Sequence, residues 1–416
     1  MKVTQLYTLI NNVTKEILGD TAVVNEDLSN VVDIGKAIFD QTSVDNYVKK
    51  LVNQIGKVVF QNRAYAGGVP SVLMDAWEFG SVLQKISMPL PEATENESWK
   101  LVDGQQYKQD VFTAPKIEAK FYNSKVTFEI PMSFTELQVK ESFSSREQLN
   151  GFVSMITTGV ENSMTVKLDA LIMRAINNMT GETLVAGIGS GVVGAKTLDF
   201  TKTSGVAVNL LALYNDSATN KVKVSNALQT PEFIRFATYT IGIYADRMSK
   251  VSKLFNVGKK ERFTPADMRR CVLLSDFSKA AVAYLQADIQ SPEMVALPAH
   301  DAVPYWQGSG TDYALSSIGI LDVKTASGET VKVPAEGAGA GKKNAAILGV
   351  MFDRDAVGVS NLDRRTTTAY NAKAEFYNNW YKMDAGYYND LNENFVVFFI
   401  GETLASTDSF RLHEIQ

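Results

Sequence analysis

The stretch that decides the fold runs from Ser144 to Gly181 and reads SSREQLNGFVSMITTGVENSMTVKLDALIMRAINNMTG. Its apolar residues recur at steps of three, four or one, the spacing of one stripe along an α-helix: Leu149, Phe152, Val153, Ile156, Val160, Met164, Leu168, Leu171, Ile172, Ala175, Ile176 and Met179. Ser144 and Glu147 form the pattern of a capping box, and Gly181 is expected to end the helix. A helix of roughly 35 residues is about 50 Å long, which exceeds the usual length in a globular domain. The stretch therefore predicts a strut helix that lies along a long apolar surface.

The segment before the strut predicts a long two-stranded arm. Residues 116–132 alternate between apolar and polar, but the parity changes around Tyr122 to Ser124, which indicates a kink or bulge. The apolar positions are Ile117, Ala119 and Phe121, and then Val126, Phe128, Ile130 and Met132. Ser81 to Met88 is a second candidate strand, and the polar, mostly acidic stretch Pro89 to Asp110 separates the two. Because an isolated hairpin is marginal in water, this arm must lie on its own domain or on another subunit.

Composition limits the classes of protein that this chain can represent. Its 416 residues, 45% of them hydrophobic, suffice for a core and for two lobes. No run of 18 apolar residues predicts a membrane span, and residues 1–10 contain no apolar signal core. Cys271 is the single cysteine, which excludes an internal disulfide framework, suits a reducing cytoplasm and is expected to be buried in a strand. The net charge of −5 argues against a dedicated nucleic-acid binder, but it permits a protein that encloses nucleic acid.

The rest of the chain alternates between helical and strand patterns. The first sixty residues contain short amphipathic segments that predict a helical arm. Thr230-Pro231 is expected to cap a helix that runs to about Val251. Further expected elements are a strand at 269–275, a helix at 276–287, a hairpin at 317–333 and strands in the aromatic final quarter. The run NFVVFFIG near the C-terminus suits a strand that is covered on both faces.

The usual sequence signs of catalysis are missing. His300 and His413 lie far apart and have no partners at metal-ligand spacing. Gly189, Gly191 and Gly194 match a dinucleotide-binding fingerprint in letters, but no helical pattern follows them. We therefore predict no catalytic residue, no cofactor and no metal site, and we predict that the protein is not an enzyme. A pair of carboxylates for glycoside hydrolysis stays open, because the spacing of such a pair in space cannot be read from sequence.

The order of these elements, together with three stretches, resembles the major capsid proteins of tailed bacteriophages. The stretches are VDNYVKKLVNQIGKVVF at 44–60, KVTFEIPMSFTELQVKESF at 125–143, and the strand-rich segment 345–399 from AAILGVMFDRD to NENFVVFF. The chain looks most similar to shell proteins of small short-tailed phages. The resemblance spans nearly the whole chain, and it implies an α+β fold of the Hong Kong 97 type.

The resemblance also implies a division of the chain. Residues 1–70 would be an N-terminal helical arm, and 71–132 the extension-loop β-hairpin. A peripheral domain would cover 133–229, with the spine helix at 145–179, and an axial domain would cover 230–344. Residues 345–416 would return as strands of the peripheral domain.

The function implied is a shell protein that assembles into pentamers and hexamers of an icosahedral head around double-stranded DNA. Contact between subunits would fall at the tip of the hairpin, at Glu92, Glu95, Glu97, Trp99, Lys100 and Lys108. Expected partners are further copies of the chain, a scaffolding protein, a portal protein and optional decoration proteins, with DNA enclosed without sequence-specific binding and no membrane. The protein would be assembled in the bacterial cytoplasm and would end in the virion. A nanocompartment shell of the encapsulin type and a carbohydrate-active enzyme are the alternatives.

Overall fold

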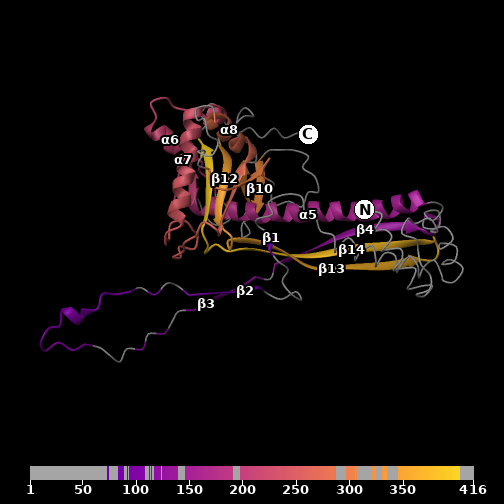
Figure 1. Ribbon diagram of the computed structural model, residues 1–416, viewed down its shortest axis with the longest axis horizontal. Helices are drawn as coiled ribbons and strands as arrows, with labels where there is room; N and C mark the ends of the chain where they lie inside the picture. The colour runs from indigo at the N-terminus through magenta and orange to yellow at the C-terminus, as the bar shows by residue number, and fades with distance from the viewer. Residues whose placement is uncertain are drawn as a thin grey trace.

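The computed structural model combines two β-sheets, one very long helix and a projecting two-stranded arm (Figure 1). The residues that it describes are 73–74, 83–88, 91, 93–107, 112, 114, 117–122, 124–138, 146–190, 197–286, 297–304, 306, 320–324, 330–334 and 345–402. The mixed helix-and-sheet class expected from the sequence is confirmed. The predicted N-terminal helices, Ser144 of the capping box and His413 fall outside the described residues.

The first sheet has four strands in the order β1-β13-β14-β4. They are β1 (Leu73–Met74), β13 (Val357–Asn371), β14 (Phe376–Asn389) and β4 (Lys125–Thr135). The two long strands β13 and β14 pair antiparallel, and β4 pairs antiparallel with the other edge of β14. Along β14 every second residue from Tyr377 to Ala385 is buried, so one face of this sheet belongs to the core.

The second sheet has five strands in the order β7-β15-β12-β8-β9. They are β7 (Ala207–Asn209), β15 (Phe395–Gly401), β12 (Ala345–Asp353), β8 (Arg269–Leu274) and β9 (Asp301–Val303). All residues of β15 are buried, with Val397 in one hydrophobic cluster and its neighbours Val396 and Phe398 in the other. The prediction of a strand covered on both faces is confirmed, and Cys271 is buried in β8 as expected.

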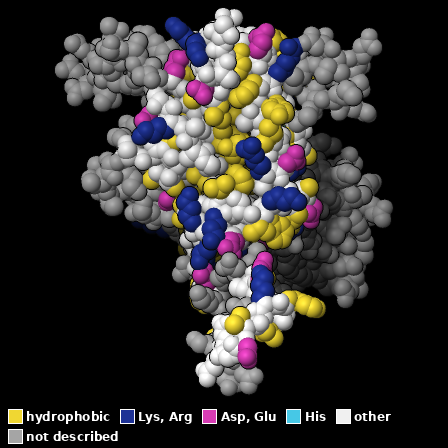
Figure 2. All heavy atoms as spheres, turned by 90° about the vertical axis from the view of Figure 1, so that its left-hand side faces the viewer, with side chains coloured by type: hydrophobic (Ala, Val, Ile, Leu, Met, Phe, Trp, Pro, Cys, Tyr) yellow, Lys and Arg dark blue, Asp and Glu magenta, His cyan; other side chains and the backbone are white. Residues whose placement is uncertain are grey.

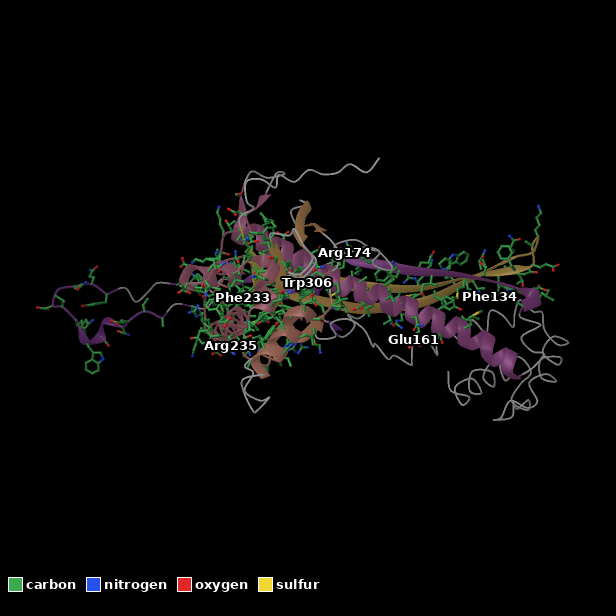
Figure 3. All side chains as sticks on the ribbon, turned by 90° about the horizontal axis from the view of Figure 1, so that it is seen from above. Phe134, Glu161, Arg174, Phe233, Arg235 and Trp306 are labelled. Carbon is green, nitrogen blue, oxygen red and sulfur yellow. The ribbon has the colours of Figure 1, made fainter. Side chains whose placement is uncertain are left out.

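The strut is helix α5 (Arg146–Ile188), and it carries one hydrophobic cluster along much of its length. Residues from Ile156 to Ile188 join inner residues of both sheets in this cluster. It also contains Phe134 of β4 and Trp306, which follows β9, and these two lie far apart along the molecule (Figure 3). The prediction that the helix ends at Gly181 is wrong. Leu184 and Ile188 continue the buried stripe, and their burial outweighs the roughly 1 kcal/mol that a glycine costs inside a helix.

The other face of the five-stranded sheet is covered by three helices, which enclose the second hydrophobic cluster. They are α6 (Leu210–Ser217), α7 (Pro231–Met248) and α8 (Ser275–Gln286), with the 3-10 helix η4 (Val224–Gln229) before α7. The predicted helices are therefore confirmed. Thr230 does occupy the N-cap position of α7, but its hydroxyl donates to the carbonyl of Asn226 at 2.9 Å instead of capping the helix.

Two small ribbons complete the described structure. Strands β10 (Ile320–Lys324) and β11 (Thr330–Pro334) pair antiparallel, which confirms the predicted hairpin, and β5 (Gly189–Ser190) pairs with β6 (Thr197–Leu198). Gly189 thus lies in a short strand that follows a helix, the reverse of the order that a dinucleotide-binding loop requires. Among the described residues, no helix is both long and apolar enough to cross a membrane.

Candidate functional site

The candidate site is the arm, a ribbon that projects from the body of the molecule (Figures 1 and 3). It consists of β2 (Leu83–Ser87), paired antiparallel with β3 (Glu118–Tyr122), and a distal tip that contains the 3-10 helix η3 (Glu97–Trp99). Strand β3 ends two residues before Ser124, and β4 of the four-stranded sheet begins at Lys125. The predicted change of parity and a two-stranded arm are confirmed, but residues 125–132, predicted as part of its second strand, lie in β4 and pair with β14 in the body. The ribbon is a separate two-stranded sheet, and the chain runs from its second strand directly into β4 of the body.

One face of the ribbon is apolar and exposed, and we call it the outer face. It carries Ile86, Met88, Ile117, Ala119 and Phe121, which alternate with the charged residues of the opposite face. Ile86, Ile117 and Phe121 are 65%, 66% and 64% exposed. Contiguous apolar surface of this kind is uncommon on a monomeric soluble protein and indicates a surface that another molecule covers.

The opposite face of the ribbon is charged and binds the body. Lys85 and Lys120 stand directly opposite each other on the two strands, and both reach Asp390 in the turn between β14 and β15. Lys85 Nζ lies 2.9 Å from Asp390 Oδ2, and Lys120 Nζ lies 2.8 Å from Asp390 Oδ1. Only 1% of the Asp390 side chain is exposed.

Four further charged residues surround this contact, and we call the whole group the arm root: Lys85, Lys120, Glu118, Lys260, Arg262, Asp390 and Glu393. Glu393 accepts hydrogen bonds from Lys85 Nζ at 2.8 Å and from Arg262 Nε at 3.1 Å. Lys260 Nζ donates to Glu118 Oε1 at 2.6 Å. Both strands of the arm are thus joined by ion pairs to the turn that carries Asp390. Strand β3 is joined in addition to the loop that carries Lys260.

The charges of the arm root shift the titration of its members. Burial alone would raise the pKa of Asp390, but the hydrogen bonds and charges of Lys120 and Lys85 outweigh it and lower the pKa to about 2. Burial likewise would lower the pKa of Lys85, but Glu393 and Asp390 raise it. The Asp390 carboxylate and the Lys85 ammonium group therefore stay ionised over the physiological pH range.

The turn that carries Asp390 is itself held firmly. The backbone N–H of Asp390 donates to the carbonyl of Ala356 at 2.8 Å, and the N–H of Gly258 donates to the carbonyl of Leu391 at 2.8 Å. The side-chain amide of Asn256 donates to the backbone carbonyl of Lys260 and accepts the backbone N–H of the same residue. These two hydrogen bonds shape the loop that presents Lys260 and Arg262. A ring contact between Tyr122 and Tyr388, with centroids 4.9 Å apart, adds an apolar contact beside the ion pairs.

The tip residues predicted as subunit contacts lie at the far end of the arm. Trp99 is 95% exposed, and Lys100 Nζ forms a long ion pair of 3.7 Å with Glu95. Glu97 lies in η3, whereas Glu92 and Lys108 fall outside the described residues. Their role as contacts stays a prediction.

Sequence reasoning missed the arm root. Glu118 and Lys120 were correctly assigned to one polar face, but Asp390 lies 270 residues from Lys120 in the chain. An acidic turn after an aromatic strand is common, so no local signal joined it to the arm.

The body above the arm also presents apolar side chains. Tyr239, Val251, Leu254 and Phe263 are exposed large hydrophobics on α7 and the loop that follows it. Figure 2 shows apolar side chains between Lys and Arg on this side of the body, with the arm pointing toward the viewer below.

The described residues contain no metal-binding cluster of His, Cys, Asp and Glu. His300 has a structural environment: its Nδ1 donates to the carbonyl of Pro298 at 3.0 Å, and its Nε2 lies 2.9 Å from Ser278 Oγ. These two bonds tie the segment before β9 to α8.

A family model described as "Phi29-like phage major capsid protein" matches residues 10–399. No curated protein matches the chain in sequence. Solved structures that resemble it include a capsid structure of Staphylococcus phage Andhra, with a TM-score of 0.44, 9% identity, and coverage of 82% of this chain and 87% of that one. A capsid structure of the cyanophage P-SCSP1u gives a TM-score of 0.43 and 11% identity, with coverage of 82% and 90%.

Proposed function

The chain belongs to the family of Phi29-like phage major capsid proteins, and from this membership we propose that its copies form the pentamers and hexamers of an icosahedral head around double-stranded DNA. Membership in a phage capsid family favours a virion shell over a nanocompartment shell. It also assigns the chain a structural role, which favours assembly over glycoside hydrolysis as its activity.

The observation that carries the proposal is the exposed outer face of the arm. Ile86, Ile117 and Phe121 are each more than half exposed in a single copy, and burying one such side chain yields about 1.5–3 kcal/mol. We propose that each arm lies on a neighbouring copy, which covers this face. The tip residues Glu95, Trp99 and Lys100, with Glu92, Glu97 and Lys108, would extend the same contact.

The symmetry of the contact follows from its two unlike sides. An arm and the surface that receives it are different patches, so the interface is heterologous, and repetition of such a contact closes a ring when the rotation fits. Rings of five and six copies tile an icosahedral shell. In this division residues 230–344 would form the axial domain near the ring centre, and the four-stranded sheet with α5 would form the peripheral domain.

Further partners are proposed on the same premise. A scaffolding protein would direct closure of the shell, a portal protein would occupy one vertex, and decoration proteins would be optional. The chain would assemble in the bacterial cytoplasm and would end in the virion. The net charge of −5 supports enclosure of DNA without tight binding to it.

The test is to express the chain alone and together with a candidate scaffolding protein from the same genome, and to examine both products by negative-stain electron microscopy. The proposal predicts closed shells or capsomer rings in at least one preparation. A monodisperse monomer in both, at concentrations up to those used for crystallisation, would contradict it.

A further inference from the structure

We propose that Asp390 positions the arm: one buried carboxylate holds both strands of the ribbon and fixes the direction in which the arm leaves the body before any partner binds. The inference rests on the proposed function, because it concerns the arm that is to reach a neighbouring copy. Three observations support it.

The first observation is that Asp390 divides its two oxygens between the two strands. Oδ2 lies 2.9 Å from Lys85 Nζ of β2, and Oδ1 lies 2.8 Å from Lys120 Nζ of β3. Oδ1 also accepts the backbone N–H of Asn392 at 3.1 Å, which fixes the carboxylate within its own turn. A rotation of either strand away from the body breaks one of these contacts.

The second observation is that the two lysines form a directly opposed cross-strand pair. Like charges at opposed positions destabilise a ribbon, and a two-stranded ribbon is marginal on its own. The carboxylate between them replaces this repulsion with two attractions. Asp390 therefore supports the pairing of β2 with β3 as well as the attachment of the ribbon to the body.

The third observation is that Asp390 belongs to a rigid part of the body. Its turn is bonded to Ala356, immediately before β13, and to Gly258 in the loop after α7. Lys260 and Arg262 of that loop bind Glu118 of the arm and Glu393 of the turn. The direction of the arm is thus set relative to both sheets, and the remaining pairs Lys260–Glu118 and Lys85–Glu393 give it a second support.

An arm that is fixed in advance changes the cost of assembly. Ordering a loop or a side chain during association lowers the affinity, whereas a preorganised element avoids that cost. With Asp390 in place, a subunit presents its outer face in a single direction and meets its neighbour without first ordering the ribbon.

The experiment is hydrogen exchange, measured by mass spectrometry on the unassembled full chain. Asp390→Asn keeps the size of the side chain but removes the anion that the two opposed lysines share, and it leaves Lys85 paired with Glu393 alone. The inference predicts that amide exchange at 83–87 and 118–122 becomes faster by roughly tenfold or more, while α7 keeps its protection. The matched control is Asp384→Asn, which removes the carboxylate that pairs with Arg365 on β13, away from the arm, and should leave exchange in the arm unchanged.

A second variant keeps the test decisive if Asp390→Asn does not fold. Lys120→Met removes the ion pair between β3 and Asp390 but leaves Asp390 paired with Lys85. This variant too should speed amide exchange at 118–122 more than in α7. Unchanged exchange in the arm, or an equal increase over arm and body, would overturn the positioning role.

Failure of this inference can be told apart from failure of the proposed function. If Asp390→Asn leaves arm exchange unchanged while wild-type shells still form, the positioning role is wrong and the capsid function stands. If the arm is loosened but shells form with unchanged yield and concentration dependence, Asp390 positions the arm but this positioning does not limit assembly; if wild type itself forms neither shells nor rings, the capsid function fails whatever the exchange shows.

Discussion

At the scale of single residues, the arm contains two kinds of ion pair with different energetic weight. Glu95 and Lys100 at the tip are almost fully exposed and 3.7 Å apart, so their pair contributes little to stability. Asp390 at the arm root is buried between two lysines, and a buried charge of this kind is costly to leave without partners, so its pairs carry more weight. Stability of the arm therefore depends on its root.

The low pKa of Asp390 predicts a loss of stability in acid. Its pKa is about 2 when folded, against an ordinary value of 3.8, so its contribution is present above pH 3.8 and is lost as the pH falls toward 2. The contribution at neutral pH is about 2 kcal/mol. The charged or titratable groups that interact with it are Lys85 on β2, Lys120 and Tyr122 on β3, and Tyr388 on β14. Glu393, which shares Lys85 with Asp390, lies beside them and pairs with Arg262, while Glu118 pairs with Lys260.

The measurement is urea unfolding of wild type and Asp390→Asn between pH 5 and pH 2. The difference in unfolding free energy between the two should shrink steadily below pH 4. A difference that stays constant over this range would contradict the low pKa.

Gly258 provides a second prediction at this scale. A Cβ at this position would overlap Asn392 Oδ1 and would lie 3.2 Å from Asn392 Cα, because the loop after α7 approaches the turn of Asp390 closely. Gly258→Ala should therefore destabilise the protein by about 1–3 kcal/mol. In contrast, Gly151→Ala in α5 meets no described atom within 4 Å and should stabilise the helix by up to about 1 kcal/mol. Thermal unfolding of both variants checks the opposite signs, and equal effects would refute the packing argument.

At the scale of elements, periodicity in the sequence predicted most of the structure. The stripe of α5, the change of parity between β3 and β4 and the doubly covered β15 each follow from which residues are apolar. The errors arise where tertiary contacts override local signals. Gly181 does not end α5 because Leu184 and Ile188 are buried beyond it, and Thr230 turns its hydroxyl to Asn226 instead of to α7.

Because the outer face of the arm ribbon is exposed in one copy, a substitution there should weaken assembly without changing the stability of the monomer. Phe121→Ser removes a large apolar group from the outer face, where it is 64% exposed in one copy. The free energy of unfolding of the monomer should stay within about 0.5 kcal/mol of wild type. The concentration needed for assembly should rise by roughly tenfold or more, since about 1.5–3 kcal/mol of burial is lost per contact.

The matched comparison is Phe398→Ala, which acts inside the body. Phe398 is fully buried in β15, so its truncation should destabilise the monomer by about 3–5 kcal/mol. Chemical unfolding and light scattering on both variants separate the two effects. If Phe121→Ser assembles at the wild-type concentration, the outer face is not an interface.

At the scale of the whole molecule, the segment 345–402 joins the two lobes. It supplies β13 and β14 to the four-stranded sheet and β12 and β15 to the five-stranded one, while α5 packs against both. No local pattern predicts this sharing, because β15 lies between β7 and β12, strands that are distant in the chain. Length and composition predicted two lobes, but the order of the strands within the sheets could not be predicted from the sequence. The arm root was missed for the same reason.

The most direct test of this account is a cryo-electron microscopy map of assembled particles, at a resolution that shows side chains. The account predicts that the ribbon of each subunit keeps its lysines on its own Asp390 and that a second subunit covers Ile86, Ile117 and Phe121. A map in which those three side chains face solvent, or in which the ribbon folds back over its own body, would contradict it.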